Sequence, residues 1–332
     1  MKIIYMNFLP KLNSFLKSAQ NPLIVVLGPT ASGKTALSLK IAHEIGGEII
    51  STDSRQIYKG LEIGSDVLPL KKRQNIPHHM IGIVEPDQSY SLAEYRDDAL
   101  KIIAQIRARK HIPMLVGGTG LYISSIIEEY DVPRIPPDKA LRERLYKEAA
   151  KKGAEALHKR LAKLDPEAAK RIHPNNLRYV IRALEINKKT GKPKTDKKAG
   201  LASSTGHGSG QTGPAKSSPF DVFMIGIEYP REELYERINK RVDEQEMRGL
   251  IEEVTNLLAH GYDESLPAMT SLGVKEIIPF IRGEQTLEEC KEILKKNTRN
   301  YAKRQMTWFR RYNRNDDKNG SNRICWIKPE DL

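Results

Sequence analysis

Residues 28–35 have the spacing with the clearest chemical meaning in this chain, and they read GPTASGKT. They fit the pattern G-x-x-x-x-G-K-[ST] without exception. The N–H groups of such a loop and of the following helix supply partial positive charge, the lysine adds a full charge, and the hydroxyl can ligate Mg²⁺. The expected phosphate-binding residues are Gly28, Pro29, Thr30, Ala31, Ser32, Gly33, Lys34 and Thr35. ATP, GTP and an isoprenoid diphosphate present the same group to this loop, so the motif leaves the ligand open.

The segments on either side of the loop are those that a phosphate-binding loop requires. Residues 23–27 (LIVVL) form an apolar run typical of a strand buried on both faces of a parallel sheet. After Lys34, apolar residues at helical spacings lead to Gly46 and Gly47, which predict the end of the helix. An unused glycine turn is the alternative, and the order of strand, loop and helix argues against it.

Two further strands, residues 48–51 and 113–117, are predicted to deliver polar groups to the same edge of the sheet. Asp53 follows the first strand and suits a general base, although this segment alone favours a cap or turn role. Three glycines within residues 117–122 (GGTGLY) follow the second. They permit close approach of a ligand or simply a tight turn.

Composition indicates a polyanionic partner. The formal net charge is +13, from 55 Lys and Arg against 42 Asp and Glu, which is more than solubility requires. No apolar run approaches the ~20 residues of a membrane span. The two cysteines lie far apart and outside any zinc spacing, which fits a reducing, cytoplasmic compartment. The pair His78 and His79 lacks other ligands at metal spacing, so a loop or core role is favoured.

We divide the chain into five segments. Residues 1–20 are expected to be a loosely ordered N-terminal extension, and residues 21–132 the catalytic core. Residues 133–194 consist of short helices rich in Lys, Arg and Ala, and residues 195–219 form a flexible Ser/Gly-rich linker. Residues 220–332 return to the core, with strand-like residues 220–229 followed by long helices over 231–258 and 287–311. The predicted fold class is α/β, a P-loop NTPase-like parallel sheet flanked by helices, with a small all-helical insertion domain.

Two basic segments are candidates for contact with nucleic acid. Arg178 and Arg182 are four apart on a predicted helix, where they either grip phosphates or form a solvated charged face. Residues 298–310 mix cations with aromatic side chains. This pattern suits phosphate contacts combined with base stacking, or an amphipathic helix that packs on the core.

Seven blocks, in order from Gly28 to Arg310, resemble the tRNA dimethylallyltransferases, also called tRNA isopentenyltransferases. They are GPTASGKT, STDSRQIYKG, PHHMIG, YSLAEY, VGGTGLY, DPEAAKRIHPNNLRYVIRALE and TRNYAKRQMTWFR. The resemblance covers most of the chain, and several blocks are distinctive of the family. It implies transfer of a dimethylallyl group from dimethylallyl diphosphate to N6 of adenosine 37, in tRNAs that read codons starting with U.

The resemblance also implies roles for individual residues. Asp53 matches the family's proposed base, and Arg231 matches an arginine expected beside the leaving diphosphate. Lys34, Thr30 and a Mg²⁺ ion on Thr35 are expected to stabilise that diphosphate. The candidates for tRNA contact are Asp53, Ser54, Arg55, Gln56, Thr119, Arg142, Arg178 and Arg182. Residues 133–194 are expected to clamp the anticodon stem-loop, and the protein is expected to act as a monomer.

Some positions depart from the family pattern. Thr270, Ser271 and Val274 lie in a segment that usually reads Gln-Ala-Ile/Leu-Gly-Tyr, and Tyr179 stands where a second arginine is common. Residues 64–66 read Gly-Ser-Asp in place of Gly-Thr-Ala. We expect this last departure to lie away from the chemistry.

Other activities are compatible with a phosphate-binding loop. A GTPase requires an N-K-x-D motif, which the sequence lacks. A small-molecule P-loop kinase would turn over ATP, but it does not account for the blocks that resemble tRNA enzymes. An RNA-binding protein with an inactive site predicts loss of Asp53 or Lys34, and both are present. An adenylate isopentenyltransferase uses free nucleotide, whereas the long basic insertion favours tRNA.

Overall fold

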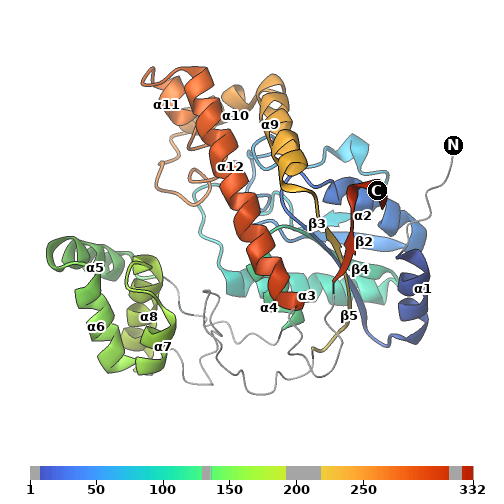
Figure 1. Ribbon diagram of the computed structural model, residues 1–332, viewed down its shortest axis with the longest axis horizontal. Helices are drawn as coiled ribbons and strands as arrows, with labels where there is room; N and C mark the ends of the chain where they lie inside the picture. The colour runs from blue at the N-terminus through green and yellow to red at the C-terminus, as the bar shows by residue number, and fades with distance from the viewer. Residues whose placement is uncertain (1–7, 129–134, 136, 192–217, 314–323, 332) are drawn as a thin grey trace. The chain divides into compact units, whose positions relative to one another are not determined.

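The computed structural model describes residues 8–128, 135, 137–191, 218–313 and 324–331 (Figure 1). The chain divides into two compact units. The core unit comprises Met1–Tyr90, Asp97–Ile123 and Ser218–Leu332, and the insertion unit comprises Ser91–Arg96 and Ser124–Ser217. The insertion unit lies between two parts of the core unit in the sequence. Its main segment, Ser124–Ser217, begins earlier and ends later than the expected 133–194.

Six strands of the core unit form one sheet in the order β3-β2-β4-β1-β5-β6. Every neighbouring pair in it is parallel. The strands are β1 (Pro22–Leu27), β2 (Gly47–Ser51), β3 (His78–His79), β4 (Ile112–Gly117), β5 (Asp221–Ile227) and β6 (Cys325–Ile327). The predicted parallel α/β sheet is confirmed. The two short edge strands β3 and β6 were not predicted, because two or three residues carry too little periodicity to be recognised.

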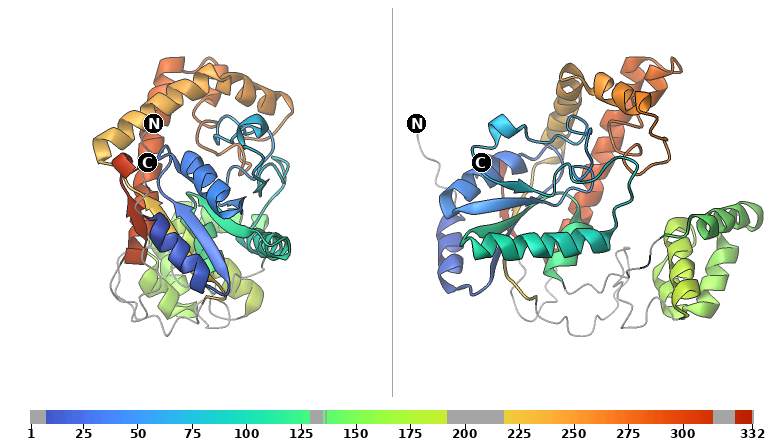
Figure 2. Two further views of the ribbon diagram at one scale, coloured as in Figure 1. Left: turned by 90° about the vertical axis from the view of Figure 1, so that its right-hand side faces the viewer. Right: turned by 180° about the vertical axis from the view of Figure 1, so that it is seen from behind.

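The N-terminal segment was predicted incorrectly. Residues 9–18 form helix α1 (Leu9–Ser18), in which Leu12 is fully buried. The ring of Phe15 lies 5.3 Å from that of Phe223 on β5. Together with α2 (Lys34–Ile45), α1 contributes to one apolar cluster with Ile24 and other side chains of the sheet (Figure 2). Apolar residues three and four apart therefore make an amphipathic helix here, although no long apolar run announces it.

The remaining helices include the two long C-terminal ones that were expected. They are α3 (Leu92–Ala108), α4 (Gly120–Ile127), α9 (Arg231–Met247), α10 (Leu250–Ala259), α11 (Ile278–Ile281) and α12 (Leu287–Phe309), with 3₁₀ turns η1 (Leu70–Lys72), η2 (Arg310–Asn313) and η3 (Pro329–Asp331). The helix predicted over residues 231–258 breaks at Gly249, whose φ of +98° favours glycine. Leu234, Ile238 and Ala302 pack α9 against α12. Among the described helices, none has the length and apolar character needed to cross a bilayer.

The described part of the insertion unit after residue 135 is all helical, as predicted. Its helices are α5 (Lys139–Lys152), α6 (Ala154–Leu164), α7 (Pro166–Arg171) and α8 (Leu177–Thr190). Leucines such as Leu141, Leu157 and Leu184 form a separate apolar cluster within it. Gly191 ends α8 with a φ of +66°. The predicted linker lies outside the described residues, apart from residues 218–219.

One buried carboxylate connects α5 to α8 in this unit. Glu185 is fully buried and accepts hydrogen bonds from Arg142 Nε at 2.9 Å and Nη2 at 2.8 Å, and from the amide of Asp138 at 2.6 Å. Arg182 also donates to it. Burial alone would raise the pKa of Glu185, but the hydrogen bonds from Arg142, Asp138 and Arg182 outweigh burial and lower it to about 2.

We expect Glu185→Gln to lower the free energy of unfolding at pH 7 by roughly 3 kcal/mol, because two arginines lose a buried partner. The pKa of this carboxyl falls from about 4.3 in the unfolded chain to about 2 in the fold. Its contribution is therefore complete above about pH 4.3 and is lost as the pH falls towards 2. Urea unfolding followed by circular dichroism should show a gap between wild type and variant that closes over this range. Glu143→Gln, at an exposed ion pair of α5, should change little, and a gap independent of pH would contradict the assignment.

Candidate active site

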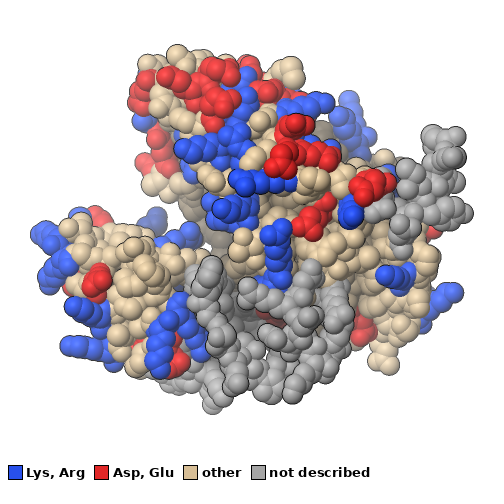
Figure 3. Space-filling model, viewed as in Figure 1, with Lys and Arg blue, Asp and Glu red and all other residues tan. Residues whose placement is uncertain are grey.

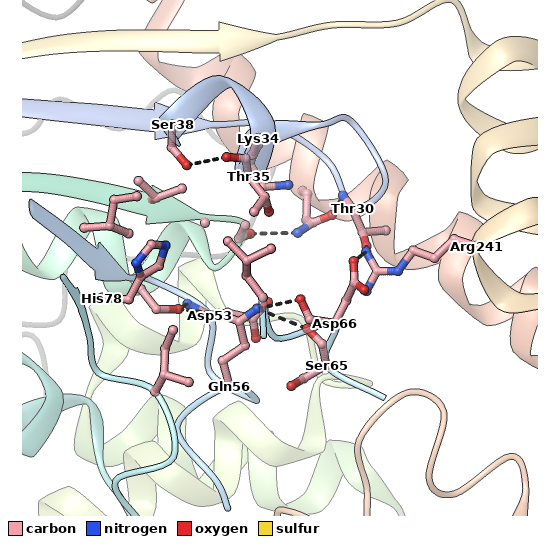
Figure 4. A pocket seen from close by; sticks show the side chains of 18 of the residues that line it. Thr30, Lys34, Thr35, Ser38, Asp53, Gln56, Ser65, Asp66, His78 and Arg241 are labelled. Carbon is pink, nitrogen blue, oxygen red and sulfur yellow. Dashed lines mark hydrogen bonds and ion pairs between the residues drawn. The ribbon is translucent and has the colours of Figure 1, made fainter. Parts of the chain in front are cut away.

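A pocket lies at the carboxyl-terminal ends of β1, β2 and β4 in the core unit (Figure 4). Its polar lining consists of Thr30, Lys34, Thr35, Ser38, Ser51, Asp53, Gln56, Ser65, Asp66, His78, Arg241, Tyr301 and Gln305. Its apolar lining consists of Ile49, Leu68, Ile81 and Val116. Parallel strands place their carboxyl ends at one edge of the sheet, so segments far apart in sequence meet there.

The phosphate-binding loop lies between β1 and α2, as predicted. Gly28 and Gly33 have φ angles of +151° and +86°, which favour glycine. A Cβ on Gly28 would lie only 3.0 Å from the carbonyl oxygen of Ile227 on β5. Lys34 Nζ donates a hydrogen bond to the carbonyl oxygen of Pro29 at 2.6 Å, which closes the loop on itself. Thr30, Lys34 and Thr35 all line the pocket.

Lys34 carries a buried ammonium group that lacks a full counter-charge. Burial and, to a smaller extent, the nearby guanidinium of Arg241 lower its pKa to about 8, against the opposite effect of the carboxylates of Asp53 and Asp66. A phosphate or diphosphate anion in the pocket would supply the missing negative charge. The loop is thus electrostatically suited to an anionic ligand.

Two arginines of α9 contact the loop. Arg241 Nη1 donates to Thr30 Oγ1 at 2.7 Å, and Arg237 Nε donates to the carbonyl oxygen of Ala31 at 2.9 Å. Arg237 also stacks on the ring of Tyr229, with its Cζ 4.7 Å from the ring centroid. Neither arginine was singled out from the sequence. Their spacing of four along one helix is the signal that could have identified them.

The arginine expected beside the leaving group, Arg231, does not line this pocket. It is exposed at the start of α9, where its Nε donates to the hydroxyl of Tyr235 at 3.2 Å. Arg241 lies almost three helical turns, or roughly 15 Å, further along α9. On α9, Arg241 is the arginine that both contacts the loop and lines the pocket, because the orientation of the helix decides which arginines reach the site.

Residues 64–66 were expected to lie away from the chemistry, and this expectation was wrong. Both Ser65 and Asp66 line the pocket. Asp66 pairs with Arg248 Nη1 at 2.7 Å and with Arg241 Nη1 at 3.6 Å. Burial would raise the pKa of Asp66, but the positive charge of Arg241 and the hydrogen bond from Arg248 lower it overall. The departure from the family pattern therefore places an additional carboxylate beside the phosphate-binding loop.

Asp53 combines the two roles left open by its sequence context. Its Oδ1 accepts a hydrogen bond from the amide of Arg55 at 2.8 Å, which caps the turn after β2. Its side chain also lines the pocket that contains Lys34. The carboxylate is thus held in place by the local backbone and faces the ligand site.

The neighbours of Asp53 are tied to several parts of the core. The amide of Ser54 donates to Thr119 Oγ1 at 3.2 Å, and Gln56 Nε2 donates to the carbonyl oxygen of Ser65 at 3.1 Å. Arg55 donates through Nη1 to the carbonyl oxygen of Pro267. Residues 53–56 therefore form an ordered wall after β2, held by hydrogen bonds to the turn after β4 and to Ser65.

The glycines after β4 allow side chains of α12 to lie close to the backbone of this turn. A Cβ on Gly118 would lie 2.0 Å from Gln305 Nε2, and one on Gly120 would lie 2.1 Å from Trp308 Cδ1. Gln305 and Trp308 both belong to α12. The turn is therefore glycine-rich because α12 packs directly on its backbone.

Most of residues 298–310 lie in α12, which has one face directed towards the pocket and another face exposed to solvent. Tyr301 and Gln305 line the pocket, whereas Lys303 and Arg304 are exposed. Burial and the charge of Asp53 raise the pKa of Tyr301 to about 12, against the opposing effect of a side-chain hydrogen bond with Thr119. Tyr301 is thus a neutral hydroxyl close to Asp53 at neutral pH. Sequence analysis named neither Tyr301 nor Gln305 as a site residue.

Three arginines proposed to contact tRNA belong to the insertion unit. Arg142 and Arg182 both bind the buried carboxylate of Glu185, so they hold this unit together. Arg178 is exposed on α8, next to Tyr179, whose exposure is 38%. Of the three, Arg178 is the one whose described environment leaves the guanidinium facing solvent.

Comparison with known proteins identifies the family. The family model described as IPP transferase matches residues 56–312, more than half of the chain, and a model described as isopentenyl transferase matches residues 21–73. The chain belongs to the IPP transferase family. It is 46% identical over 316 residues to the tRNA dimethylallyltransferase of Pelotomaculum thermopropionicum, covering 95% of this chain and 93% of that protein. The corresponding protein of Caldanaerobacter subterraneus is 45% identical, covering 87% and 89%.

Solved structures agree with this IPP transferase assignment. The tRNA isopentenylpyrophosphate transferase of Bacillus halodurans superposes with a TM-score of 0.64 at 38% identity, covering 93% of this chain and 90% of that one. A eukaryotic dimethylallyltransferase acting on tRNA superposes with a TM-score of 0.70 at 28% identity, covering 87% and 70%. The match extends over both units of this IPP transferase.

The chemistry of the pocket fits a magnesium ion that arrives with a phosphate ligand. The Thr35 hydroxyl and the carboxylates of Asp53 and Asp66 line the same cavity as Lys34. In the described ranges, no three His, Cys, Asp or Glu side chains gather as a metal cluster. Mg²⁺ commonly binds through one or two protein oxygens and substrate phosphates, so this IPP transferase needs no dedicated cage.

The low pKa of Lys34 predicts proton uptake when an anion binds. At pH 8.5 most of the free enzyme should carry a neutral Lys34, since its pKa is about 8, and a bound diphosphate should raise that pKa. We expect uptake of up to about 0.8 proton per methyl diphosphate bound at this pH, and weaker binding as the pH rises further. Calorimetry in two buffers of different ionisation enthalpy measures this number. Lys34→Met should abolish the uptake, and equal uptake in that variant would assign the proton to another group.

Proposed function

We propose that this IPP transferase transfers a dimethylallyl group from dimethylallyl diphosphate to N6 of adenosine 37 in tRNAs that read codons starting with U. The products are N6-isopentenyladenosine and diphosphate. The observation that carries this proposal is one pocket that joins the phosphate-binding loop of Lys34 to the carboxylate of Asp53. The relatives named tRNA dimethylallyltransferase support it, because they match most of this chain.

The apolar lining favours a prenyl donor over the γ-phosphate chemistry of a kinase. Ile49, Leu68, Ile81 and Val116 line the same cavity as the cationic residues. Transfer of a five-carbon allyl chain from water to contact with such side chains is favourable and strengthens binding of the donor. A diphosphate with a short apolar tail therefore matches both halves of the pocket.

Stabilisation of the leaving group is assigned to the phosphate-binding loop and its arginines. As the allylic C–O bond breaks, its electron pair moves onto the diphosphate oxygen. Lys34 and Arg241 line the pocket and stabilise the negative charge on that oxygen, and Thr30 is oriented by its hydrogen bond from Arg241. Arg237 adds positive charge at the loop, where it donates to the carbonyl oxygen of Ala31. Mg²⁺ bound with the donor would neutralise further charge on the diphosphate, with Thr35 as its protein ligand.

Activation of the acceptor is assigned to Asp53. The exocyclic amine of adenine is a poor nucleophile because its lone pair is delocalised into the ring. As the nitrogen forms its bond to the allylic carbon, Asp53 accepts one of the amine protons, which leaves a neutral secondary amine. The base must leave its stack to reach this pocket, so recognition includes base flipping and contacts to neighbouring nucleotides.

Exposed cations offer surfaces for the RNA backbone. Figure 3 shows Lys and Arg side chains over the region that α9 and α12 occupy in Figure 1. Lys296, Lys303 and Arg304 are exposed on α12. Arg310 is exposed at the start of η2, where its Nη2 also pairs with Glu228 at 3.0 Å. We assign these cations and Arg178 of the insertion unit to phosphate contacts, which add affinity without reading sequence.

The proposal extends to the state and location of the protein. One chain supplies the donor loop and Asp53, so a monomer suffices for the chemistry. Cys290 and Cys325 are free thiols, which suits the reducing cytoplasm. Size-exclusion chromatography with light scattering at assay concentrations tests the monomer.

The decisive assay combines purified protein, Mg²⁺ and labelled dimethylallyl diphosphate with one of two acceptors. The first is an unmodified anticodon stem-loop carrying A36-A37-A38, and the second is free AMP. Nucleoside mass spectrometry should find isopentenyladenosine at position 37 of the RNA alone. Product from AMP alone would move the protein to the adenylate isopentenyltransferases, and ATP hydrolysis without either product would favour a kinase.

We expect Asp53→Asn to lower kcat about 10²- to 10⁴-fold, because the amide cannot accept the proton of the amine. The dissociation constant of the stem-loop should remain within about twofold, since the amide oxygen can still cap the turn. Single-turnover kinetics and fluorescence anisotropy measure the two quantities. Full turnover by this variant would show that Asp53 is not the base.

We expect Arg178→Ala to weaken stem-loop binding and to reduce the slope of log K against log salt by about one, because one phosphate contact is lost. Arg178→Lys should retain most of the slope. Arg182 is unsuitable for this test, because its removal would also leave the buried Glu185 short of a partner. Unchanged affinity and slope in Arg178→Ala would remove Arg178 from the RNA interface.

A further inference from the structure

Gln305 connects the two halves of the pocket through a single amide group. It lies on α12 with only 5% of its surface exposed. Its Oε1 accepts a hydrogen bond from the amide of Thr30 at 2.8 Å, and its Nε2 donates to the carbonyl oxygen of Gly118 at 3.0 Å. Thr30 belongs to the phosphate-binding loop, and Gly118 belongs to the turn after β4 that precedes Thr119.

The partners fix the orientation of this amide. A backbone N–H can only donate and a carbonyl oxygen can only accept, so Oε1 must face Thr30 and Nε2 must face Gly118. A carboxylate or an apolar side chain cannot satisfy both partners. The bridge also consumes the N–H of Thr30, so this donor stabilises the position of the loop and is not directed at a phosphate.

The space for this bridge is built into the glycine turn. A Cβ on Gly118 would lie 2.0 Å from Gln305 Nε2, which is too close for any side chain to be accommodated without movement. One helical turn before Gln305, Tyr301 forms a side-chain hydrogen bond with Thr119. The Oγ1 of Thr119 also accepts a hydrogen bond from the amide of Ser54, in the wall that carries Asp53. One face of α12 thus touches both the donor loop and the segment that leads to the acceptor base.

We propose that Gln305 is a positioning residue that fixes the distance between the phosphate-binding loop and the turn after β4. This inference rests on the proposed function, in which the loop holds the diphosphate and the turn adjoins the wall that holds the base. Bond formation requires the allylic carbon and the amine nitrogen within about 3–3.5 Å, and an error of roughly 1 Å costs about 10²-fold in rate. A bridge between the two segments therefore acts on the chemical step more than on the binding of either substrate.

Three variants separate positioning from simple stability. Gln305→Leu removes both hydrogen bonds at similar volume. Gln305→Glu keeps an acceptor for the amide of Thr30 but places a carboxylate oxygen against the carbonyl oxygen of Gly118. Leu294→Ala, at a site on the same helix that is 2% exposed, destabilises α12 without touching the pocket.

We expect Gln305→Leu to lower kcat, and the rate constant measured under single-turnover conditions, about 10- to 100-fold. The KM for dimethylallyl diphosphate and the affinity for the stem-loop should each change less than about threefold. Leu294→Ala should lower Tm but leave kcat near that of wild type. Relative to wild type at the same pH, Gln305→Glu should recover activity as the pH falls, because a protonated carboxyl can donate to Gly118.

A measurement without substrate tests the contact itself. Hydrogen exchange at the amide of Thr30, followed by NMR, should be faster in Gln305→Leu than in wild type and should remain slow in Gln305→Glu. This result holds whatever reaction the enzyme catalyses. Unchanged exchange in Gln305→Leu would overturn the bridge.

The activity measurements distinguish failure of this inference from failure of the proposed function. If the wild type does not modify the stem-loop, the proposed function is wrong, and hydrogen exchange alone decides whether the bridge exists. If the wild type is active and Gln305→Leu loses Tm but keeps kcat, Gln305 is only structural. If that variant raises the KM for the donor and keeps kcat, Gln305 serves binding, and the positioning role is wrong.

Discussion

The burial of one positive charge organises the pocket of this protein. Lys34 lies beneath the phosphate-binding loop, where loss of water lowers its pKa to about 8. Desolvation of an ammonium group is costly, so the surroundings supply partial compensation from the carbonyl oxygen of Pro29 and the carboxylates of Asp53 and Asp66. Arg241 adds positive charge that these groups do not fully offset. The pocket is therefore completed electrostatically by an anion, and the chemistry proposed for it begins with a diphosphate.

The parallel sheet explains why so few segments are needed to build both sides of the site. The ends of β1, β2 and β4 deliver the phosphate-binding loop, the wall at Asp53 and the glycine turn to one edge. Helix α12 then crosses these segments with Gln305, while α9 supplies Arg237 and Arg241. Each contact from α9 or α12 joins residues almost two hundred or more positions apart, so the site depends on the packing of the whole core unit.

Charge in the insertion unit has two different uses. Arg142 and Arg182 surround the buried Glu185. Loss of these arginines would leave its carboxylate buried without a counter-charge. Arg178, on the same helix as Arg182, is exposed. The 55 Lys and Arg residues of the sequence are consequently not all available to a polyanion, since some arginines are committed to internal ion pairs.

Local sequence patterns were sufficient to predict the phosphate-binding loop, the strands β1, β2, β4 and β5, most of the helices and the family. These features depend on local spacing, on apolar periodicity and on glycines that permit positive φ, all of which are written in consecutive residues. Long-range packing was needed to show that Arg237 and Arg241 contact the loop while Arg231 does not, and that Asp66 lines the pocket. It was also needed to show that α1 packs on the sheet and that Gln305 joins Thr30 to Gly118. The physical reason is that a helix pattern shows which residues share a face, whereas the partner of that face depends on how the helix is oriented against segments far away in sequence.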